Sequence, residues 1–208
     1  MTIPEIDTAT ALMLVGCSIA SMTDATTGKI LNVLTGPLVV AGLIVNAMAG
    51  SWEIGVWGFV LATQIHLPLY FAKIEKGGDV KLLMGIGACM GPTFILNTSF
   101  WYAVLYLVIG PLVLLYRKRV KNLLVVGIHL ANKAKGGPGS EDSADAPQTT
   151  TLWTAPVIFG AALAAWISTY PAGTSLEIGT RWGQVLTVIY VIGWVLYKVI
   201  RGKVPQKS

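Results

Sequence analysis

Asp24 and Asp79 are the residues of this sequence whose type and placement best suit chemistry. Asp24 directly follows one apolar stretch, and Asp79 directly precedes another. Ionisable side chains at membrane depth are costly, so they are candidates for function. Two carboxyls held close together cannot both ionise easily, so the pair shares one proton. One member can then activate water while the other polarises a carbonyl. The sequence therefore predicts an acid–base pair.

The residues around Asp79 fit this chemistry. Gly77 and Gly78 precede it and remove side-chain bulk, so an extended peptide backbone can come close. Lys81 follows two positions later and can favour an ionised Asp79, steer an acidic group of a substrate, or anchor the chain at the membrane surface. Simpler explanations remain for each acid: Asp24 as a loop residue at the membrane interface, and Asp79 as the N-cap of the next helix.

The elements that must position the two acids are membrane helices. Of the 208 residues, 54% are hydrophobic and 12% charged, whereas soluble domains carry about 25% charged residues. Apolar segments near the length of about 20 residues that crosses a bilayer recur along the chain. They cover 6–23, 33–50, 53–72, 80–92, 97–116, 152–170 and 182–200. The predicted fold is an all-α, polytopic transmembrane helix bundle of six to seven spans.

The distribution of basic residues sets the expected orientation. Cytoplasmic loops are enriched in Lys and Arg. With the N-terminus outside and the C-terminus inside, every Lys and Arg except Arg181 falls on the cytoplasmic side. The loop after Asp24 and the loop before Asp79 are then both cytoplasmic. We therefore expect the two acids to meet at the inner surface of the membrane.

Three regions follow from this topology. Residues 1–116 form the membrane core that carries both acids. Residues 117–151 form a cytoplasmic segment that begins basic and interfacial, suited to anionic lipid, and continues as a flexible linker rich in small and acidic residues. Residues 152–208 hold the last spans and a basic tail. The first apolar segment has no preceding Lys or Arg, so we expect a retained helix and no cleaved signal peptide.

The other candidate residues favour packing over chemistry. Cys17 and Cys89 lie in apolar stretches without a CxxC pair, so no thiolate zinc site is expected. No metal, other cofactor or nucleic acid is expected as a partner. His66 is expected to be neutral and hydrogen-bonded inside the bundle, with a proton relay as the alternative. Gly87 and Gly91 form a GxxxG pattern, which favours close packing within the chain first and a homodimer second.

Two motifs resemble those of the type IV prepilin (leader) peptidases, membrane aspartic proteases of the GxGD type. The segment GGDVKLL at 77–83 is similar to the GD-x-K-L signature of the second catalytic aspartate. The segment DATTGKILN at 24–32 is similar to the first aspartate and its I-P-N turn. The likeness covers residues 5–115. Lys76 stands where the first Gly of GxGD is usual, and Leu31 where the turn proline is usual.

The resemblance implies an aspartic endopeptidase with Asp24 and Asp79 as catalytic residues. It implies removal of leaders from type IV prepilin or pseudopilin precursors at the cytoplasmic face of the prokaryotic inner membrane, without a cofactor. Asn32 runs directly into the next apolar segment, so the chain is similar to the short form that lacks the N-methyltransferase region. The alternatives are a small membrane transporter that uses the same acids, and an inactive assembly protein of a pilus or secretion system.

The helix dipoles suggest which acid would hold the shared proton. Asp79 opens a helix, where the positive end of the dipole favours an anion, and Asp24 closes one, where the negative end disfavours it. On this argument Asp79 is the ionised general base, and Asp24 is its protonated partner.

Overall fold

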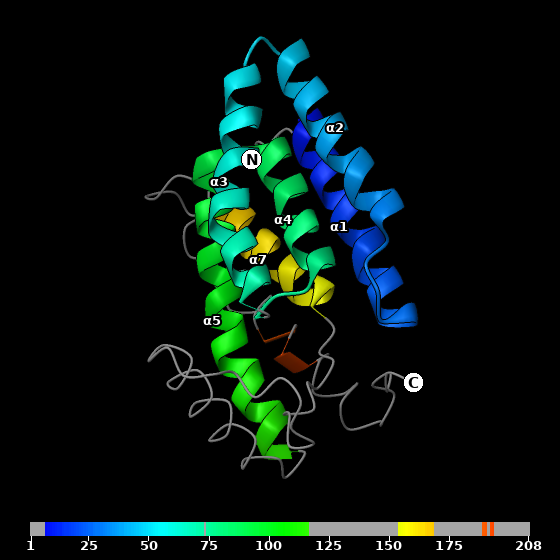
Figure 1. The fold of residues 1–208 in the computed structure, drawn as a ribbon, viewed down its shortest axis with the longest axis vertical. Helices are drawn as coiled ribbons and strands as arrows, with labels where there is room; N and C mark the ends of the chain where they lie inside the picture. Colours follow the sequence, from blue (N-terminus) through cyan, green and yellow to red (C-terminus); the bar gives the residue numbers. More distant parts are fainter. Residues whose placement is uncertain (1–6, 73, 117–153, 169–188, 191, 194–208) are drawn as a thin grey trace, which may run out of the picture.

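A computed structural model describes residues 7–72, 74–116, 154–168, 189–190 and 192–193. Within these ranges the chain is helical and contains no strand, which confirms the predicted all-α class. The helices are α1 (Thr8–Thr27), α2 (Asn32–Met48), α3 (Trp52–Phe71), α4 (Gly77–Met90), α5 (Pro92–Tyr116) and α7 (Ala155–Ser168), arranged as a bundle (Figure 1).

Helix α4 occupies the centre of the bundle. It packs against α1, α2, α3, α5 and α7, and most of its residues are buried. With 14 residues it is about 21 Å long, shorter than the hydrocarbon core of about 30 Å. Protein instead of lipid therefore surrounds α4, as a helix too short to cross the membrane requires.

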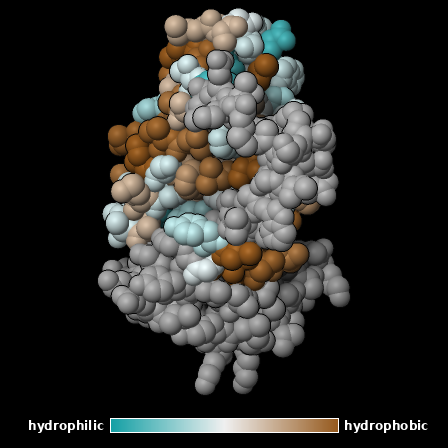
Figure 2. Space-filling view, turned by 180° about the vertical axis from the view of Figure 1, so that it is seen from behind, coloured by the Kyte–Doolittle hydropathy of each residue, from teal (hydrophilic) through white to brown (hydrophobic). Residues whose placement is uncertain are grey.

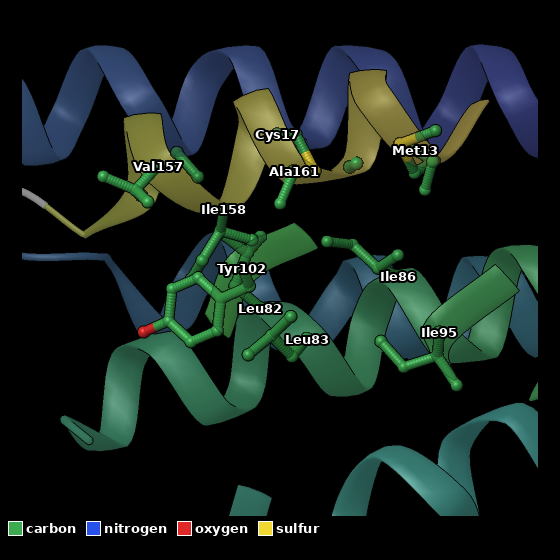
Figure 3. Packing of buried hydrophobic residues seen from close by; sticks show 14 of the residues in the cluster. Met13, Cys17, Leu82, Leu83, Ile86, Ile95, Tyr102, Val157, Ile158 and Ala161 are labelled. Atoms are coloured by element: carbon green, nitrogen blue, oxygen red, sulfur yellow. The ribbon is translucent and has the colours of Figure 1, made fainter. Parts of the chain in front are cut away.

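Side chains from α1, α2, α3, α5 and α7 fill the core next to α4. Leu82, Leu83 and Ile86 of α4 are fully buried and face α1 and α7 across the bundle (Figure 3). The neighbouring helices add Met13 and Cys17 from α1, Ile95 and Tyr102 from α5, and Val157, Ile158 and Ala161 from α7. The core thus joins the N-terminal helices to α7, which comes much later in the sequence.

Helices α3 and α4 approach most closely at Gly58 and Gly87. A Cβ atom on either glycine would overlap the backbone carbonyl oxygen of the other. The predicted packing role of Gly87 within the chain is confirmed, because this residue lies buried against α3. Gly91 follows α4 with a positive φ of 85°, and Pro92 then begins α5. A homodimer remains a prediction.

Replacing Gly87 by alanine is expected to destabilise the bundle. The new methyl group would lie against the Gly58 carbonyl, a backbone group that can move only if α3 and α4 separate. Overpacking of this kind costs about 1–3 kcal/mol. Thermal unfolding in detergent should show a lower midpoint for Gly87→Ala. The matched control is Gly36→Ala in α2, where no atom lies within 4 Å of the added Cβ; an equal loss in that variant would contradict the prediction.

Asn46 connects α2 to the C-terminal end of α4. Its side-chain amide is buried and donates to the carbonyl oxygens of Ala88 and Cys89, each at 2.9 Å. Carbonyls in the last turn of a helix have no partner within the helix. Asn46 therefore caps α4 at the end opposite Asp79.

The outer surface of the described helices is apolar, as in a membrane protein. Among the described residues, three helical segments are long and apolar enough to cross a bilayer, at Thr8–Thr27, Trp52–Phe71 and Pro92–Ile109. Helices α2 and α7 are shorter apolar helices. In Figure 2 apolar residues form patches on the described part of the surface, with more polar residues between them. The most exposed of the large ones include Val33, Met48, Phe71 and Leu107.

The helix boundaries correct the predicted segments at both acids. The first segment was predicted to end at 23, but α1 continues through Thr27, and Gly28 ends it in a left-handed conformation with its N–H on the Asp24 carbonyl. The fourth was predicted to begin at 80, but α4 begins at Gly77. Hydropathy falls at the first polar residues, whereas the helical hydrogen bonds continue past them. Asp24 and Asp79 are thus helical residues, and the N-cap of α4 is Lys76.

Several predictions fall outside the described residues. They include the basic and flexible region 117–151, the segment 182–200 apart from residues 189–190 and 192–193, and the C-terminal tail. The division into three regions, the number of membrane crossings and the orientation of the termini stay predictions.

Candidate active site

The two motifs meet at one end of the bundle. The α1–α2 and α3–α4 connections both lie at the lower end in Figure 1, opposite the α2–α3 connection. The Lys81 ammonium donates to Asn32 Oδ1 at 2.9 Å, which joins α4 to the start of α2. A Cβ on Gly78 would lie 3.0 Å from the Ile30 side chain. The segments that carry Asp24 and Asp79 are therefore in direct contact.

Asp24 lies in the last turn of α1 and faces the beginning of α7. Its carboxylate oxygen Oδ2 accepts a hydrogen bond from the Ala155 N–H at 3.0 Å, and it also faces the Thr154 backbone. Asp24 is 2% exposed. The first N–H groups of a helix have no partner within the helix and carry its positive dipole end. Helix α7 thus directs its positive end at Asp24.

Asp79 is the third residue of α4 and is also 2% exposed. Its Oδ2 accepts a long hydrogen bond from the Lys76 N–H at 3.4 Å, which holds the carboxyl at the start of the helix. The Thr154 hydroxyl faces the same carboxyl, but Oγ1 has no hydrogen bond of ordinary geometry in the described part of the chain, so this contact is long or poorly aligned. Thr154 and Ala155 thus lie between the two acids.

The two carboxyls interact with each other and with one cation. Asp79 precedes the apolar part of α4, and burial raises the pKa of its carboxyl to about 6, with a further rise from the charge of Asp24. The Thr154 hydroxyl and the positive charge of Lys76 lower the pKa of Asp79 in part. The positive charge of Lys76 also acts on the carboxyl of Asp24. Asp79 therefore retains a proton to higher pH than an exposed aspartate does.

Replacing Asp79 by asparagine is expected to stabilise the protein at high pH only. The pKa of Asp79 is higher in the folded chain than the ordinary 3.8, so the folded state loses stability as pH rises from about 4 to 6 and beyond. One pKa unit corresponds to about 1.4 kcal/mol, so the ionised Asp79 lowers the free energy of unfolding by about 3 kcal/mol above pH 7. Asparagine cannot ionise, so Asp79→Asn should unfold at a higher temperature than wild type at pH 8 and at a similar one at pH 4.

The matched control for this measurement is Glu53→Gln, which neutralises an exposed carboxyl in the first turn of α3. Its unfolding midpoint should stay close to that of wild type at both pH values. The same gain for Asp79→Asn at pH 4 and pH 8 would show that ionisation is not the cause.

The supporting residues predicted from the sequence all lie at this end of the bundle. Gly77 is next to the Tyr70 ring, which would be 3.3 Å from an added Cβ, and the space beside Gly78 is occupied by Ile30. These two glycines thus allow Tyr70 and Ile30 to pack closely against the first turn of α4. Lys81 reaches Asn32, whereas Lys76 is the lysine whose charge acts on both acids. The roles predicted for Gly77, Gly78 and Lys81 in the reaction stay predictions.

Sequence reasoning missed two features of the site. Thr154 and Ala155 carry no motif, and Ala155 lies 131 residues from Asp24 in the chain. Lys76 was noted only as a departure from the GxGD pattern, although a cation so close to Asp79 in sequence was a usable signal. Within the described ranges, no three His, Cys, Asp or Glu side chains gather as a metal-binding group would.

The comparison with protein families agrees with this geometry. The model of the type IV leader peptidase family matches residues 11–111. Residues 11–111 belong to the type IV leader peptidase family. The matched segment covers nearly all of α1–α5 and contains both Asp24 and Asp79, and its family indicates a protease. Helix α7 lies beyond it. No curated protein and no solved structure matches the chain.

Proposed function

We propose that this protein is a membrane aspartic endopeptidase that removes leader peptides from type IV prepilins or related precursors. The observation that carries the proposal is the meeting of the Asp24 and Asp79 carboxyls, both buried, at one end of an apolar helix bundle. The leader peptidase family supports the substrate class. The apolar surface of the bundle supports a membrane location, for which we propose the cytoplasmic membrane of a prokaryote.

The reaction needs one ionised and one protonated carboxyl. The ionised acid removes a proton from water as the water attacks the carbonyl carbon of the scissile peptide bond. The protonated acid donates a hydrogen bond to the carbonyl oxygen, where negative charge develops. Proton transfer to the leaving nitrogen then breaks the bond and yields a carboxylic acid and an amine. The pair returns to its starting state with one shared proton.

We assign Asp24 as the ionised base and Asp79 as the protonated acid, the reverse of the assignment from the helix dipoles of α1 and α4. That argument lacked α7, whose first N–H groups face Asp24 and stabilise negative charge there. Hydrogen bonds to a carboxylate favour its charged form. The hydrogen bond from the Lys76 N–H to Asp79 is longer, at 3.4 Å, and burial together with the charge of Asp24 favours the protonated form of Asp79. The pair still titrates as a unit.

Processing of a prepilin in membranes tests the proposal. The wild-type protein would be co-expressed with a type IV prepilin, and the mass of the pilin would be followed by gel shift and mass spectrometry. We expect cleavage just before the hydrophobic segment of the pilin, and an N-terminal residue that carries no methyl group. An intact leader in the presence of inserted, folded protein would reject the peptidase function and favour an assembly or transport role.

A further inference from the structure

A second buried polar cluster lies beside the aspartate pair, at the start of the loop that leads to Asp79. His66 of α3 is 2% exposed. Its Nδ1 lies 3.0 and 3.1 Å from the two carboxylate oxygens of Glu75, and its Nε2 lies 2.9 Å from Ser99 Oγ in α5. The edge of the Tyr102 ring packs against the imidazole at 6.3 Å between centroids. The cluster joins α3, α5 and the α3–α4 loop.

The hydrogen bonds assign a proton to each nitrogen of His66. The single hydroxyl hydrogen of Ser99 points to the Ile95 carbonyl, 2.7 Å away. Ser99 therefore accepts, and His66 Nε2 donates. Both oxygens of Glu75 lie at nearly the same distance from Nδ1, which fits one N–H shared by a carboxylate better than a carboxylic acid that offers one hydrogen. The predicted hydrogen-bonded position of His66 inside the bundle is confirmed. In place of the neutral histidine expected from the sequence, we treat its contact with Glu75 as an ion pair.

The position of the loop depends on this pair. The Ile74 N–H and the Glu75 N–H both bond to the Leu69 carbonyl, at 2.9 and 3.3 Å. The segment after Glu75 consists of Lys76 and two glycines, and the glycines have no side chain that could anchor them. The Glu75 carboxylate thus ties this loop to α3 just before the turn of α4 that carries Asp79.

Backbone hydrogen bonds connect the residue after Glu75 directly to Asp79. The Asp79 and Val80 N–H groups bond to the Lys76 carbonyl at 3.0 and 3.2 Å, and the Lys76 N–H bonds back to the Asp79 carboxylate at 3.4 Å. A shift of Glu75 would therefore move Lys76 and, through it, both the Asp79 backbone and its side chain.

Packing alone gives no reason for a charged pair at this place. Removing two charges from water is costly, and a buried pair often adds little net stability compared with apolar residues of the same size. What a buried pair supplies is a fixed geometry, because separating its two members leaves an uncompensated charge in the core. The contact between His66 and Glu75 thus fixes the position of the α3–α4 loop relative to α3.

We infer that His66 and Glu75 are positioning residues for the peptidase reaction: together they fix the α3–α4 loop so that Asp79 faces Asp24. The inference rests on the proposed function. Neither side chain touches the reacting atoms in this scheme. A displacement of about 1 Å at a catalytic group can lower the rate about 100-fold, so loosening this loop should act on turnover more than on substrate binding.

Glu75→Ala, His66→Ala and the double variant test the inference. We expect each single variant to lower kcat about 10- to 100-fold, with KM changed less than about twofold and a faster hydrogen exchange of the Asp79 and Val80 amides. The double variant should be no worse than the singles, because the two residues act as one unit. Glu75→Gln keeps an acceptor for His66 and should recover part of kcat; it also replaces Glu75→Ala if that variant fails to fold.

Asn46→Ala is the matched control. It removes another buried polar side chain that binds α4, at the end away from Asp79. It should lower the unfolding midpoint and leave kcat of the folded protein and exchange at Asp79 and Val80 unchanged. If the Glu75 and His66 variants behave as Asn46→Ala does, the two residues only stabilise the fold and the inference is wrong.

Hydrogen exchange separates failure of this inference from failure of the proposed function. If wild type cleaves no prepilin, the peptidase proposal fails, and the Asp79 and Val80 amides still report whether Glu75 holds the loop. Unchanged exchange in Glu75→Ala would overturn the positioning role whatever the activity of wild type.

Discussion

Asp24→Asn and Asp79→Asn should each lower prepilin processing about 100- to 10,000-fold, the largest effect expected among these substitutions. Loss of a general acid or base typically costs about 100- to 10,000-fold, and neither carboxyl has a neighbour that could replace it in the geometry described. Asparagine retains the size and the acceptor oxygen of each side chain, so the fold should persist. The measurement is the rate of leader removal by purified variants in detergent.

Glu53→Gln is the control, because it neutralises an acid that is exposed in the first turn of α3. Its processing rate should equal that of wild type. Substantial processing by Asp24→Asn, with the variant correctly inserted and folded, would contradict the dyad. Near-complete loss in only one of the two variants would indicate that the other aspartate has a structural role alone.

Ala155→Pro should lower processing about 10- to 100-fold with α7 kept as a helix, because the Asp24 carboxyl loses a donor and is displaced by the proline ring. Proline is favoured at the first position of a helix, which is where Ala155 stands in α7. The substitution removes the N–H that bonds to Asp24 at 3.0 Å. A hydrogen bond to a charged group contributes about 1.5–3 kcal/mol, which corresponds to this range of rates. The processing assay and thermal unfolding would be measured together.

Ala155→Gly is the matched control, since glycine changes the side chain at the same position but keeps the backbone N–H. Its processing rate should stay near that of wild type. If Ala155→Pro folds and processes the prepilin normally, the contact between α7 and Asp24 has no part in the reaction.

The sequence was sufficient for the helices and for the pair of acids, for a clear physical reason. Long apolar segments in a chain with few charges can satisfy their backbone hydrogen bonds in a membrane as helices. Each described helix overlaps one of the predicted segments. Asp24 and Asp79 stood out because so few acids remain near those segments. The ends of the helices were harder to predict from the sequence. The helical hydrogen bonds of α1 continue to Thr27 and those of α4 begin at Gly77, although these end residues are not apolar.

The rest of the site depends on tertiary contacts that no local pattern carries. Nothing near Ala155 indicates that its N–H will meet Asp24, because this contact follows from how α7 packs against α1. The assignment of charge within the pair changed for this reason. The contact between His66 and Glu75 could have been predicted from the sequence. The histidine lies near the end of one apolar segment, and the acid lies in the loop directly after it.

The contact between Asp24 and the first residues of α7 also has a consequence for biosynthesis. A ribosome completes α1–α5 well before it reaches α7, so a nascent chain carries both aspartates while the donor for one of them has yet to be made. The carboxyl pair gains its final surroundings only when the later helix has been inserted beside α1. A half-synthesised protease in this membrane would thus hold its acids without the group that fixes their charge.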